Sequence, residues 1–160
     1  MNIRLAQMED AKVLDGLLTR LIRYEHRYDG NLNPEYTVTD NYANMLGHEG
    51  CMIWLAEENG SACGFLCAIV YDFPVYGKPV VILDALYVCE ECRRRGIATA
   101  LMAELKRYAV SISAHAIELK VYSSNAQALE LYTRSGFVET KKYLQLEVTH
   151  SLPYPEQGRG

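Results

Sequence analysis

Residues 80–109 limit the fold more than any other part of the sequence. They read VVILDALYVCEECRRRGIATALMAELKRYA. The nearly unbroken apolar stretch at 80–88 has the length and composition of a buried strand. A short loop with three arginines and a glycine follows, and from Gly96 to about Ala109 apolar residues recur at the spacing of a helix face. The sequence therefore predicts a strand, a tight loop and a helix in direct succession.

Patterns of the same kinds locate the remaining elements. Asn59-Gly60, between two apolar runs, is typical of a two-residue hairpin. A hairpin-rich first half and a β-α-β-α-β second half predict an α+β fold around one sheet. The expected strands are 2–6, 51–58, 62–73, 80–88, 116–122 and one or two within 137–148; the expected helices are 8–28, a weaker 37–50 capped by Thr39 or Asp40, 96–109 and 125–136; the expected loops are 29–34 and 74–79.

Length and composition narrow the class of protein. A chain of 160 residues suits one domain, which we place at 1–150, with a flexible tail at 151–160. The formal net charge of −4 argues against general nucleic-acid binding, because that requires a positive face. No apolar run is long enough to predict a membrane helix, and MNIRLAQMED does not resemble a secretion signal. Five cysteines, an odd number, then fit reduced thiols in a cytoplasmic protein.

Residues 93–95 form a positive run in this acidic chain. The simplest interpretation is a solvated charge run, partly neutralised by Glu90 and Glu91. Its position favours another interpretation, because the first backbone N–H groups of a helix have no intrahelical partner and lie at the positive end of the helix dipole. Gly96 has no Cβ that would keep a ligand away from them. The combination predicts a site for an anion with several oxygens, such as a pyrophosphate.

Two motifs decide between the known classes of phosphate-binding loop. The patterns G-x-x-x-x-G-K-[ST] and G-x-G-x-x-G are absent, whereas R-x-x-G-x-A is present as Arg93, Gly96 and Ala98. Further along, residues 125–137 match N-x-x-A-x-x-x-Y-x-x-x-G-F. In this order the two motifs resemble the signatures of the GNAT superfamily of N-acetyltransferases. The resemblance covers about residues 52–148 and extends more loosely over 3–50.

The resemblance implies a three-layer fold and a cosubstrate. The sheet would be mixed and mostly antiparallel, with about seven strands, about four flanking helices, and the fourth and fifth strands splayed apart. The cosubstrate would be acetyl-CoA, with no metal, and its acetyl group would be transferred to an amine. The implied cofactor-binding residues are Leu86, Tyr87 and Val88 along the fourth strand, Arg93, Arg94, Arg95, Gly96, Ile97, Ala98 and Thr99 at the loop, and Asn125, Ala128 and Tyr132.

Asp84 is the one acid within the apolar stretch 80–88. A charge there is costly unless it is paired or used. We expect Asp84 to be the general base, acting directly or through water, on the same strand face as Val88, four residues on. The alternative is a structural aspartate that caps a bulge or pairs with a core arginine.

Tyr132 and Asn125 lie seven residues apart, and so on one helix face. The resemblance implies that Tyr132 is the general acid for the leaving thiolate and that Asn125 bonds the pantetheine. Tyr132 as a packing residue and Asn125 as a plain N-cap are the alternatives, and the second is compatible with the functional role.

Cys89 and Cys92 form a C-x-x-C pair that is also found in redox and zinc sites. Cys63 and Cys67 cannot complete a four-thiolate site together, because in a strand they would be about 13 Å apart. The histidines are scattered along the chain. We therefore expect no metal or redox centre.

The acceptor is the least defined part of the prediction. In the family resembled, acceptor choice lies in the segments that here are 24–36 and 71–79. Their acids, Glu25, Asp29 and Asp72, together with Asp84, are expected to favour a small cationic amine. A protein lysine or N-terminus is the alternative, and a non-catalytic CoA-binding module is a third. A homodimer is compatible with the resemblance, and we expect neither nucleic acid nor membrane as a partner.

Overall fold

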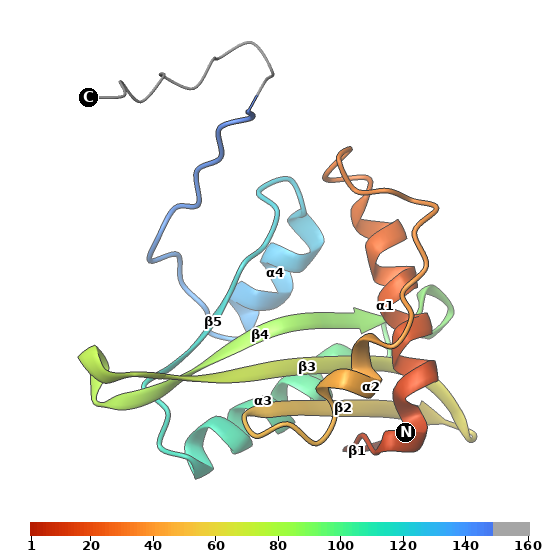
Figure 1. Ribbon diagram of the computed structural model, residues 1–160, viewed down its shortest axis with the longest axis horizontal. Coiled ribbons are helices and arrows are strands. Elements are labelled where there is room, and N and C mark those ends of the chain that lie inside the picture. Colours follow the sequence, from red (N-terminus) through yellow and green to blue (C-terminus); the bar gives the residue numbers. More distant parts are fainter. Residues whose placement is uncertain (149–160) are drawn as a thin grey trace, which may run out of the picture.

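One sheet with helices on both faces organises residues 1–148 of the computed structural model, the part of the chain that the structure describes (Figure 1). The strands of this sheet follow sequence order. The pairs β1–β2, β2–β3 and β3–β4 are antiparallel, and the pair β4–β5 is parallel. The strands are β1 (Asn2–Leu5), β2 (Cys51–Glu58), β3 (Ser61–Phe73), β4 (Lys78–Val88) and β5 (Ala116–Leu119); the helices are α1 (Ala11–Glu25), α2 (Asn41–Met45), α3 (Ile97–Ser111) and α4 (Ala126–Arg134).

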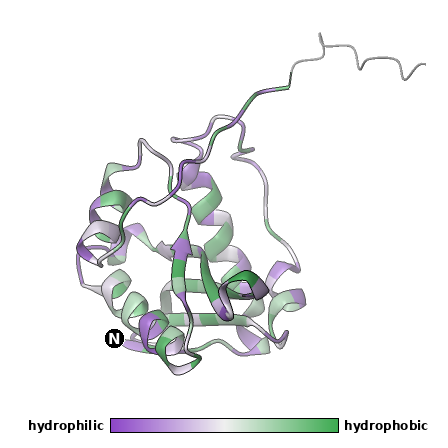
Figure 2. Ribbon diagram, turned by 90° about the vertical axis from the view of Figure 1, so that its left-hand side faces the viewer, coloured by the Kyte–Doolittle hydropathy of each residue, from purple (hydrophilic) through white to green (hydrophobic). Residues whose placement is uncertain are grey.

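Each face of the sheet has its own apolar cluster. Alternate residues of a strand point to opposite faces, so the central strands supply side chains to both clusters. Green, apolar segments of the helices turn toward the sheet in Figure 2. The α1–α2 face buries Leu14, Leu17, Tyr42, Leu55, Phe65, Cys67, Ala85 and Tyr87, and the α3 face buries Trp54, Leu66, Ala68, Val81, Leu83, Ile97, Leu101 and Leu105.

Two buried polar side chains of α1 hold the following segment in place. The Asp15 carboxylate accepts a hydrogen bond from the backbone N–H of Tyr42 at 3.0 Å, which satisfies one free N–H in the first turn of α2. The Thr19 hydroxyl accepts one from the backbone N–H of Val38 at 3.0 Å. Asp40 precedes α2 in a left-handed conformation and makes no side-chain cap, so the predicted cap comes from α1 instead. The weak helix predicted at 37–50 is accordingly only the short α2.

The predicted hairpin is confirmed. Asn59 and Gly60 both have positive φ, and Glu58 pairs with Ser61 across the turn. The loop predicted at 74–79 contains a 3-10 turn, Pro74–Tyr76, and β4 already begins at Lys78. β3 and β4 therefore form a longer hairpin than predicted, which projects at the left of Figure 1.

The prediction of about seven strands is wrong for the described residues. The sheet there has five strands, and the strands expected within 137–148 are not formed. This segment is an extended chain (Figure 1) that contacts β5 through side chains, such as Lys141 with Glu118 at 3.5 Å, and its apolar side chains, such as Leu144 and Leu146, are exposed. Alternation of apolar residues indicates an amphipathic strand but does not specify a partner for it. The tail predicted at 151–160 lies outside the described residues.

Candidate active site

β4 and β5 separate in the middle of β4. Their parallel pairing covers Val80 to Leu83 and ends at Leu83 opposite Leu119. Between Asp84 and Val88, β4 has β3 on one side but no strand partner on the other within the described chain. Backbone N–H and C=O groups on that open edge are therefore available to an extended ligand. The splayed strand pair that the motifs led us to expect is present in this form.

Asp84 is an extra residue in β4. Cys67 of β3 faces Ala85, and its neighbour Ala68 faces Leu83, so Asp84 is left without a partner in a β-bulge. The bulge changes the alternation of side chains. Leu83 packs on the α3 face, whereas Ala85 packs on the α1–α2 face, although they are two residues apart.

The bulge also changes the environment of the Asp84 carboxylate. Because Leu83 packs on the α3 face, alternation directs the next side chain, that of Asp84, to the α1–α2 face. Val88 packs on the other face, so the predicted sharing of a face by Asp84 and Val88 is wrong. The physical reason is that one extra residue reverses a period of two.

Asp84 is exposed on the surface of the sheet. Protein atoms on the sheet side of the carboxylate still displace part of its water, and this desolvation raises its pKa above the ordinary value. Within residues 1–148 it has no ion-pair partner, so the structural alternative of a core arginine partner does not hold there. An unpaired carboxylate with a raised pKa is suited to accept a proton.

The loop between β4 and α3 presents a run of free backbone donors. From Arg94 to Thr99 no backbone N–H makes a hydrogen bond inside the described chain, and the first that does is Ala100, which donates to Gly96 at 2.9 Å. Arg94 and Gly96 both have positive φ, 62° and 76°, which bends the chain around these N–H groups. A Cβ placed on Gly96 would meet no atom within 4 Å, so the space in front of the loop is open.

The three arginines of the loop have different surroundings. Arg93 donates from Nε to the carbonyl of Val88 at 3.0 Å and covers the ring of Tyr24 at 4.5 Å. Arg95 pairs with Glu58 at 2.8 Å. Arg94 is exposed and has no side-chain partner in residues 1–148, so its guanidinium is the most available of the three. Arg93 and Arg95 therefore hold the loop in shape as well as adding positive charge.

α4 positions the second motif. The Asn125 side chain accepts a hydrogen bond from the backbone N–H of Ala128 at 3.1 Å, so Asn125 is the N-cap, and Gly136, with φ of 95°, follows the helix end. Tyr132 packs edge-to-face on Phe137 and joins the α3-face cluster. Burial, and after it the Glu25 carboxylate, raise the pKa of Tyr132 to about 12. Its hydroxyl therefore keeps its proton at neutral pH and can donate it to a ligand.

Two of the predicted acceptor-binding acids lie together, and a third lies apart from them. Burial, and after it the neighbouring Asp29, raise the pKa of Glu25. Tyr122, after β5, donates to Asp29 at 3.3 Å, and its ring stacks on Tyr28. These two contacts of Tyr122 join the segment after α1 to the chain between β5 and α4. Asp72 instead lies on the projecting β3–β4 hairpin, on the other side of the bulge.

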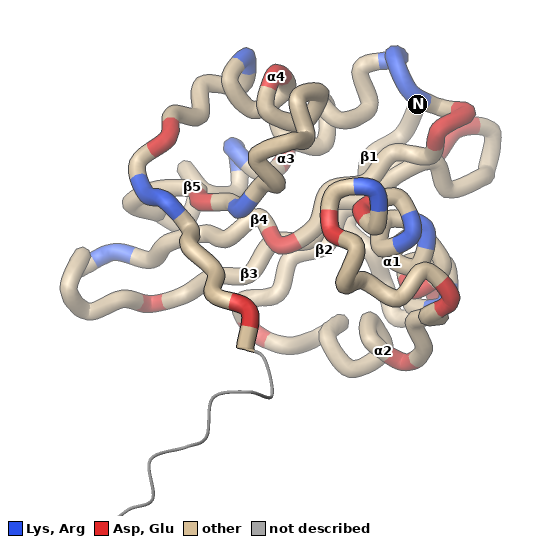
Figure 3. The backbone as a smooth tube through the Cα atoms, turned by 90° about the horizontal axis from the view of Figure 1, so that it is seen from above, with Lys and Arg blue, Asp and Glu red and all other residues tan. Residues whose placement is uncertain are grey.

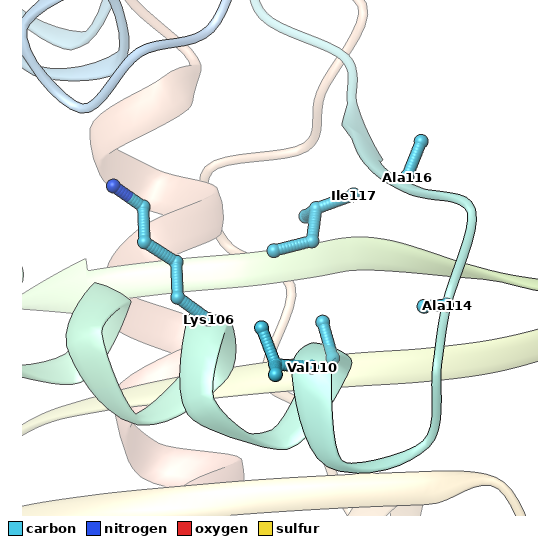
Figure 4. A pocket seen from close by; sticks show the side chains of 6 residues that line it. Lys106, Val110, Ala114, Ala116 and Ile117 are labelled. Carbon is cyan, nitrogen blue, oxygen red and sulfur yellow. The ribbon is translucent and has the colours of Figure 1, made fainter.

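An apolar groove of about 310 Å³ lies between α3 and the start of β5 (Figure 4). The one charged residue that lines it, Lys106, donates to the carbonyl of Ser135 at 2.6 Å.

In residues 1–148 no three His, Cys, Asp or Glu side chains are placed to hold a metal ion, and no helix there has the length and apolarity needed to cross a membrane.

The motifs did not identify every residue at the opening above β4. Tyr122 and Tyr28 bridge α1 and the β5–α4 connection, and Tyr24 supports Arg93. The only signal in the sequence was the number of tyrosines in 24–36, which does not indicate which of them face the site.

Comparisons with known proteins agree with this geometry. The model of the Acetyltransferase (GNAT) family matches residues 18–137. The uncharacterized N-acetyltransferase YhfO of Bacillus subtilis is 29% identical over 139 residues, which are 87% of this chain and 91% of that protein. A mutant of the BH1408 protein from Bacillus halodurans has a TM-score of 0.80 at 21% identity, over 93% of this chain and 100% of that chain. The aminoglycoside N-acetyltransferase AAC(6')-Iy, solved in complex with CoA, has a TM-score of 0.71 at 21% identity, over 92% of this chain and 99% of that chain. The chain belongs to the GNAT family of acyl-CoA-dependent N-acetyltransferases.

Proposed function

We propose that this protein transfers an acetyl group from acetyl-CoA to a small cationic primary amine by direct attack of the amine on the thioester. The observation that carries the proposal is the run of free backbone N–H groups from Arg94 to Thr99 beside the open edge of β4. Few ligands need an anion site and an extended backbone partner next to each other. Acetyl-CoA does, with its pyrophosphate and its amide-containing pantetheine arm.

The residues present fit this cosubstrate. The pyrophosphate would accept hydrogen bonds from the loop and from Arg94, at the positive end of the α3 dipole. The pantetheine amides would bond the open edge between Asp84 and Val88. The Asn125 amide nitrogen is free to bond the same arm while its oxygen caps α4.

Asp84 and Tyr132 supply the two proton transfers. An alkyl ammonium has a pKa of about 10, so the acceptor must lose a proton before it can attack. Asp84, directly or through water, takes that proton. The amine nitrogen then bonds to the thioester carbonyl carbon, the carbon–sulfur bond breaks, and the sulfur takes a proton from Tyr132. The nitrogen releases its remaining extra proton as the amide forms, and that proton returns to Tyr132 directly or through water. The high pKa of the Tyr132 hydroxyl keeps it protonated for this step.

The acceptor class follows from the charge at the end of α1. Glu25 and Asp29 are two nearby carboxylates, flanked by the aromatic rings of Tyr28 and Tyr122. Carboxylates attract a cation, and aromatic faces add to that attraction. A diamine, polyamine or aminosugar offers one amine to react and another charge to hold. The aminoglycoside acetyltransferase of the same fold is named for acceptors of this chemical class.

The test is release of free thiol from acetyl-CoA with a panel of amines and product masses as the second readout. The panel contains diamines, polyamines, aminosugars, amino acids and lysine-containing peptides. Acetylation of cationic small amines above all others is the expected result. Preference for a lysine-containing peptide would instead indicate that the acceptor is a protein. If no acceptor is acetylated although CoA binds, the chain would be a non-catalytic CoA-binding module.

The chain also has a surface for association with a second copy. Along 137–148 the side chains of Val138, Tyr143, Leu144, Leu146 and Val148 are each at least 76% exposed, which is unusual for so many apolar residues in one short segment. The outer edge of β5 has no strand partner in the described chain. A homodimer joined through these segments would cover both features. Sedimentation should show a dimer that becomes a monomer in Leu144→Lys/Leu146→Lys, and a monomeric wild type would contradict it.

A further inference from the structure

A second group of arginines lies at the end of α1, next to the arginine loop. Arg20 and Arg23 are on α1, Arg27 is in the turn that follows it, and basic segments gather in this region in Figure 3. With Tyr24, Tyr87 and Glu90 these arginines line an open, polar cavity of about 310 Å³. None of the roles derived above uses this cavity.

Carboxylates neutralise only part of the positive charge of the arginines around this cavity. Arg20 pairs with Glu91 at 2.9 Å, and Arg27 approaches Glu90 only to 3.9 Å, beyond hydrogen-bond distance. In residues 1–148 the one hydrogen bond of the Arg23 side chain goes to the hydroxyl of Thr37, at 3.5 Å. Arg93, at the cavity's border, has no carboxylate partner in the described chain.

Aromatic rings hold two of these cations close to each other. The guanidinium of Arg27 lies 3.7 Å from the ring centre of Tyr24, and that of Arg93 lies 4.5 Å from the same ring centre. Each contact is favourable, but two positive charges around one ring repel each other. An anion bound within reach of both would remove that repulsion. In a chain with a net charge of −4, such a preorganised group of cations is unlike an ordinary solvated surface.

The cavity is continuous with the loop that carries the free N–H groups, because Arg93 borders one and begins the other. A ligand whose pyrophosphate lies at residues 94–99 would therefore extend a neighbouring group toward α1. CoA has such a group, the phosphate monoester on its ribose, which carries close to two negative charges at neutral pH.

We propose that the cavity between α1 and the arginine loop is a second oxyanion site, which takes a phosphate monoester or carboxylate group. This rests on the proposed function for its placement beside acetyl-CoA. The ribose 3′-phosphate of CoA is one source of the anion, and an acidic group on the acceptor is the other. Guanidinium groups recognise both by paired, charge-assisted hydrogen bonds.

The experiment compares CoA with dephospho-CoA, which lacks only the 3′-phosphate, by calorimetry without turnover. The variant is Arg23→Gln, because within the described part of the chain Arg23 has no carboxylate partner that its removal would leave unpaired. The control is Arg107→Gln on α3, which removes an arginine paired with Glu104. Wild type and the control should bind CoA roughly tenfold tighter than dephospho-CoA. Arg23→Gln should lose most of this difference while binding dephospho-CoA as the wild type does.

If the wild type binds CoA and dephospho-CoA equally, the oxyanion site would take an acidic group of the acceptor and not the 3′-phosphate of CoA. Arg23→Gln should then raise KM for amines that carry a carboxylate or phosphate, and not for the same amines without it. If neither the nucleotide difference nor the acceptor KM responds to Arg23→Gln, the oxyanion site is refuted.

A third measurement does not depend on the proposed function. Inorganic phosphate should raise the melting temperature of the wild type and of Arg107→Gln more than that of Arg23→Gln. If no CoA derivative binds, the proposed function fails, and the phosphate measurement alone decides the anion site. Equal phosphate stabilisation of all three proteins in that case would overturn it.

Discussion

Leu83 of β4 faces Leu119 of β5 as the last pair of their parallel ladder, and the bulged Asp84 comes directly after it. The strands therefore part at the residue where β4 also reverses its alternation. One consequence is an open strand edge, and the other is a carboxylate directed to the α1–α2 face. The open edge and the carboxylate therefore lie next to each other in β4.

Asp84→Asn should lower the acetylation rate roughly 100-fold near neutral pH, because it removes the proton acceptor and keeps the side-chain shape. Much of this loss should be recovered toward high pH, where more of the amine is already neutral. The measurement is kcat/KM from pH 6 to 9 with a fixed amine. Unchanged activity over this range would assign proton removal to water or to another acid.

The same variant should not be less stable than the wild type. Burial raises the pKa of Asp84 in the folded state, so the folded chain holds this proton more tightly than the unfolded chain does. Ionisation of Asp84 therefore destabilises the fold at pH values above its ordinary range, and the asparagine removes that penalty. Thermal melts should show an equal or higher melting temperature for Asp84→Asn at pH 7, with the gain disappearing as pH falls toward about 4. A clear loss of stability at pH 7 would indicate a structural carboxylate.

Tyr132→Phe should lower kcat roughly 10- to 1000-fold and leave CoA affinity and melting temperature nearly unchanged. Phenylalanine keeps the ring that packs on Phe137 and removes only the hydroxyl. Because the pKa of Tyr132 is about 12, its proton is present throughout pH 6 to 9, so the loss should be of similar size at every pH in that range. Normal turnover by Tyr132→Phe would make Tyr132 a packing residue.

Gly96→Glu should weaken CoA binding more than tenfold, about 1.4 kcal/mol, because it places a side chain and a like charge in the open space before the free N–H groups. Gly60→Glu is a matched control. Gly60 has φ of 77° against 76° for Gly96, and a Cβ would meet no atom within 4 Å at either position. Both variants should lose similar stability, and only Gly96→Glu should lose affinity in calorimetry. Equal affinities of the two for CoA would contradict an anion site at the loop.

Asn125→Ser and Asn125→Ala should separate the two roles of Asn125. Serine is about as good an N-cap as asparagine, whereas alanine costs about 1 kcal/mol of stability. Both substitutions remove the amide nitrogen that would bond the pantetheine. We expect both variants to bind CoA more weakly and only Asn125→Ala to melt clearly lower. A serine variant with wild-type affinity would restrict Asn125 to capping.

The sequence predicted those parts of the site that depend on local chemistry. Asn59-Gly60, Asn125 and Gly136 each act on their own turn or helix end, so their effects are legible from neighbouring residues. The run of free N–H groups at 94–99 is local in the same sense, because it needs only a helix start and a glycine. The family motifs then linked it to Tyr132.

The parts that were missed depend on partners distant in sequence. A bulge at Asp84 was one of the alternatives drawn from the sequence, but its formation depends on Cys67 and Ala68 of β3, which the residues 80–88 alone do not specify. Residues 137–148 alternate like a strand but have no paired neighbour in the described chain. The cavity beside α1 forms only where Tyr87 and Glu90 meet the arginines of residues 20–27, which are distant from them in the sequence.

The bulge lets β4 carry one residue that its pairing with β3 does not need. Leu83 and Ala85 already face the consecutive residues Ala68 and Cys67, and they pack on opposite faces of the sheet. Deleting Asp84 would therefore leave a regularly alternating strand in which Leu86 and Tyr87 keep their partners and their faces. A single codon deletion at position 84 should remove the carboxylate and leave both apolar clusters formed, whereas deletion of Leu86 should move Tyr87 to the α3 face and disrupt both clusters.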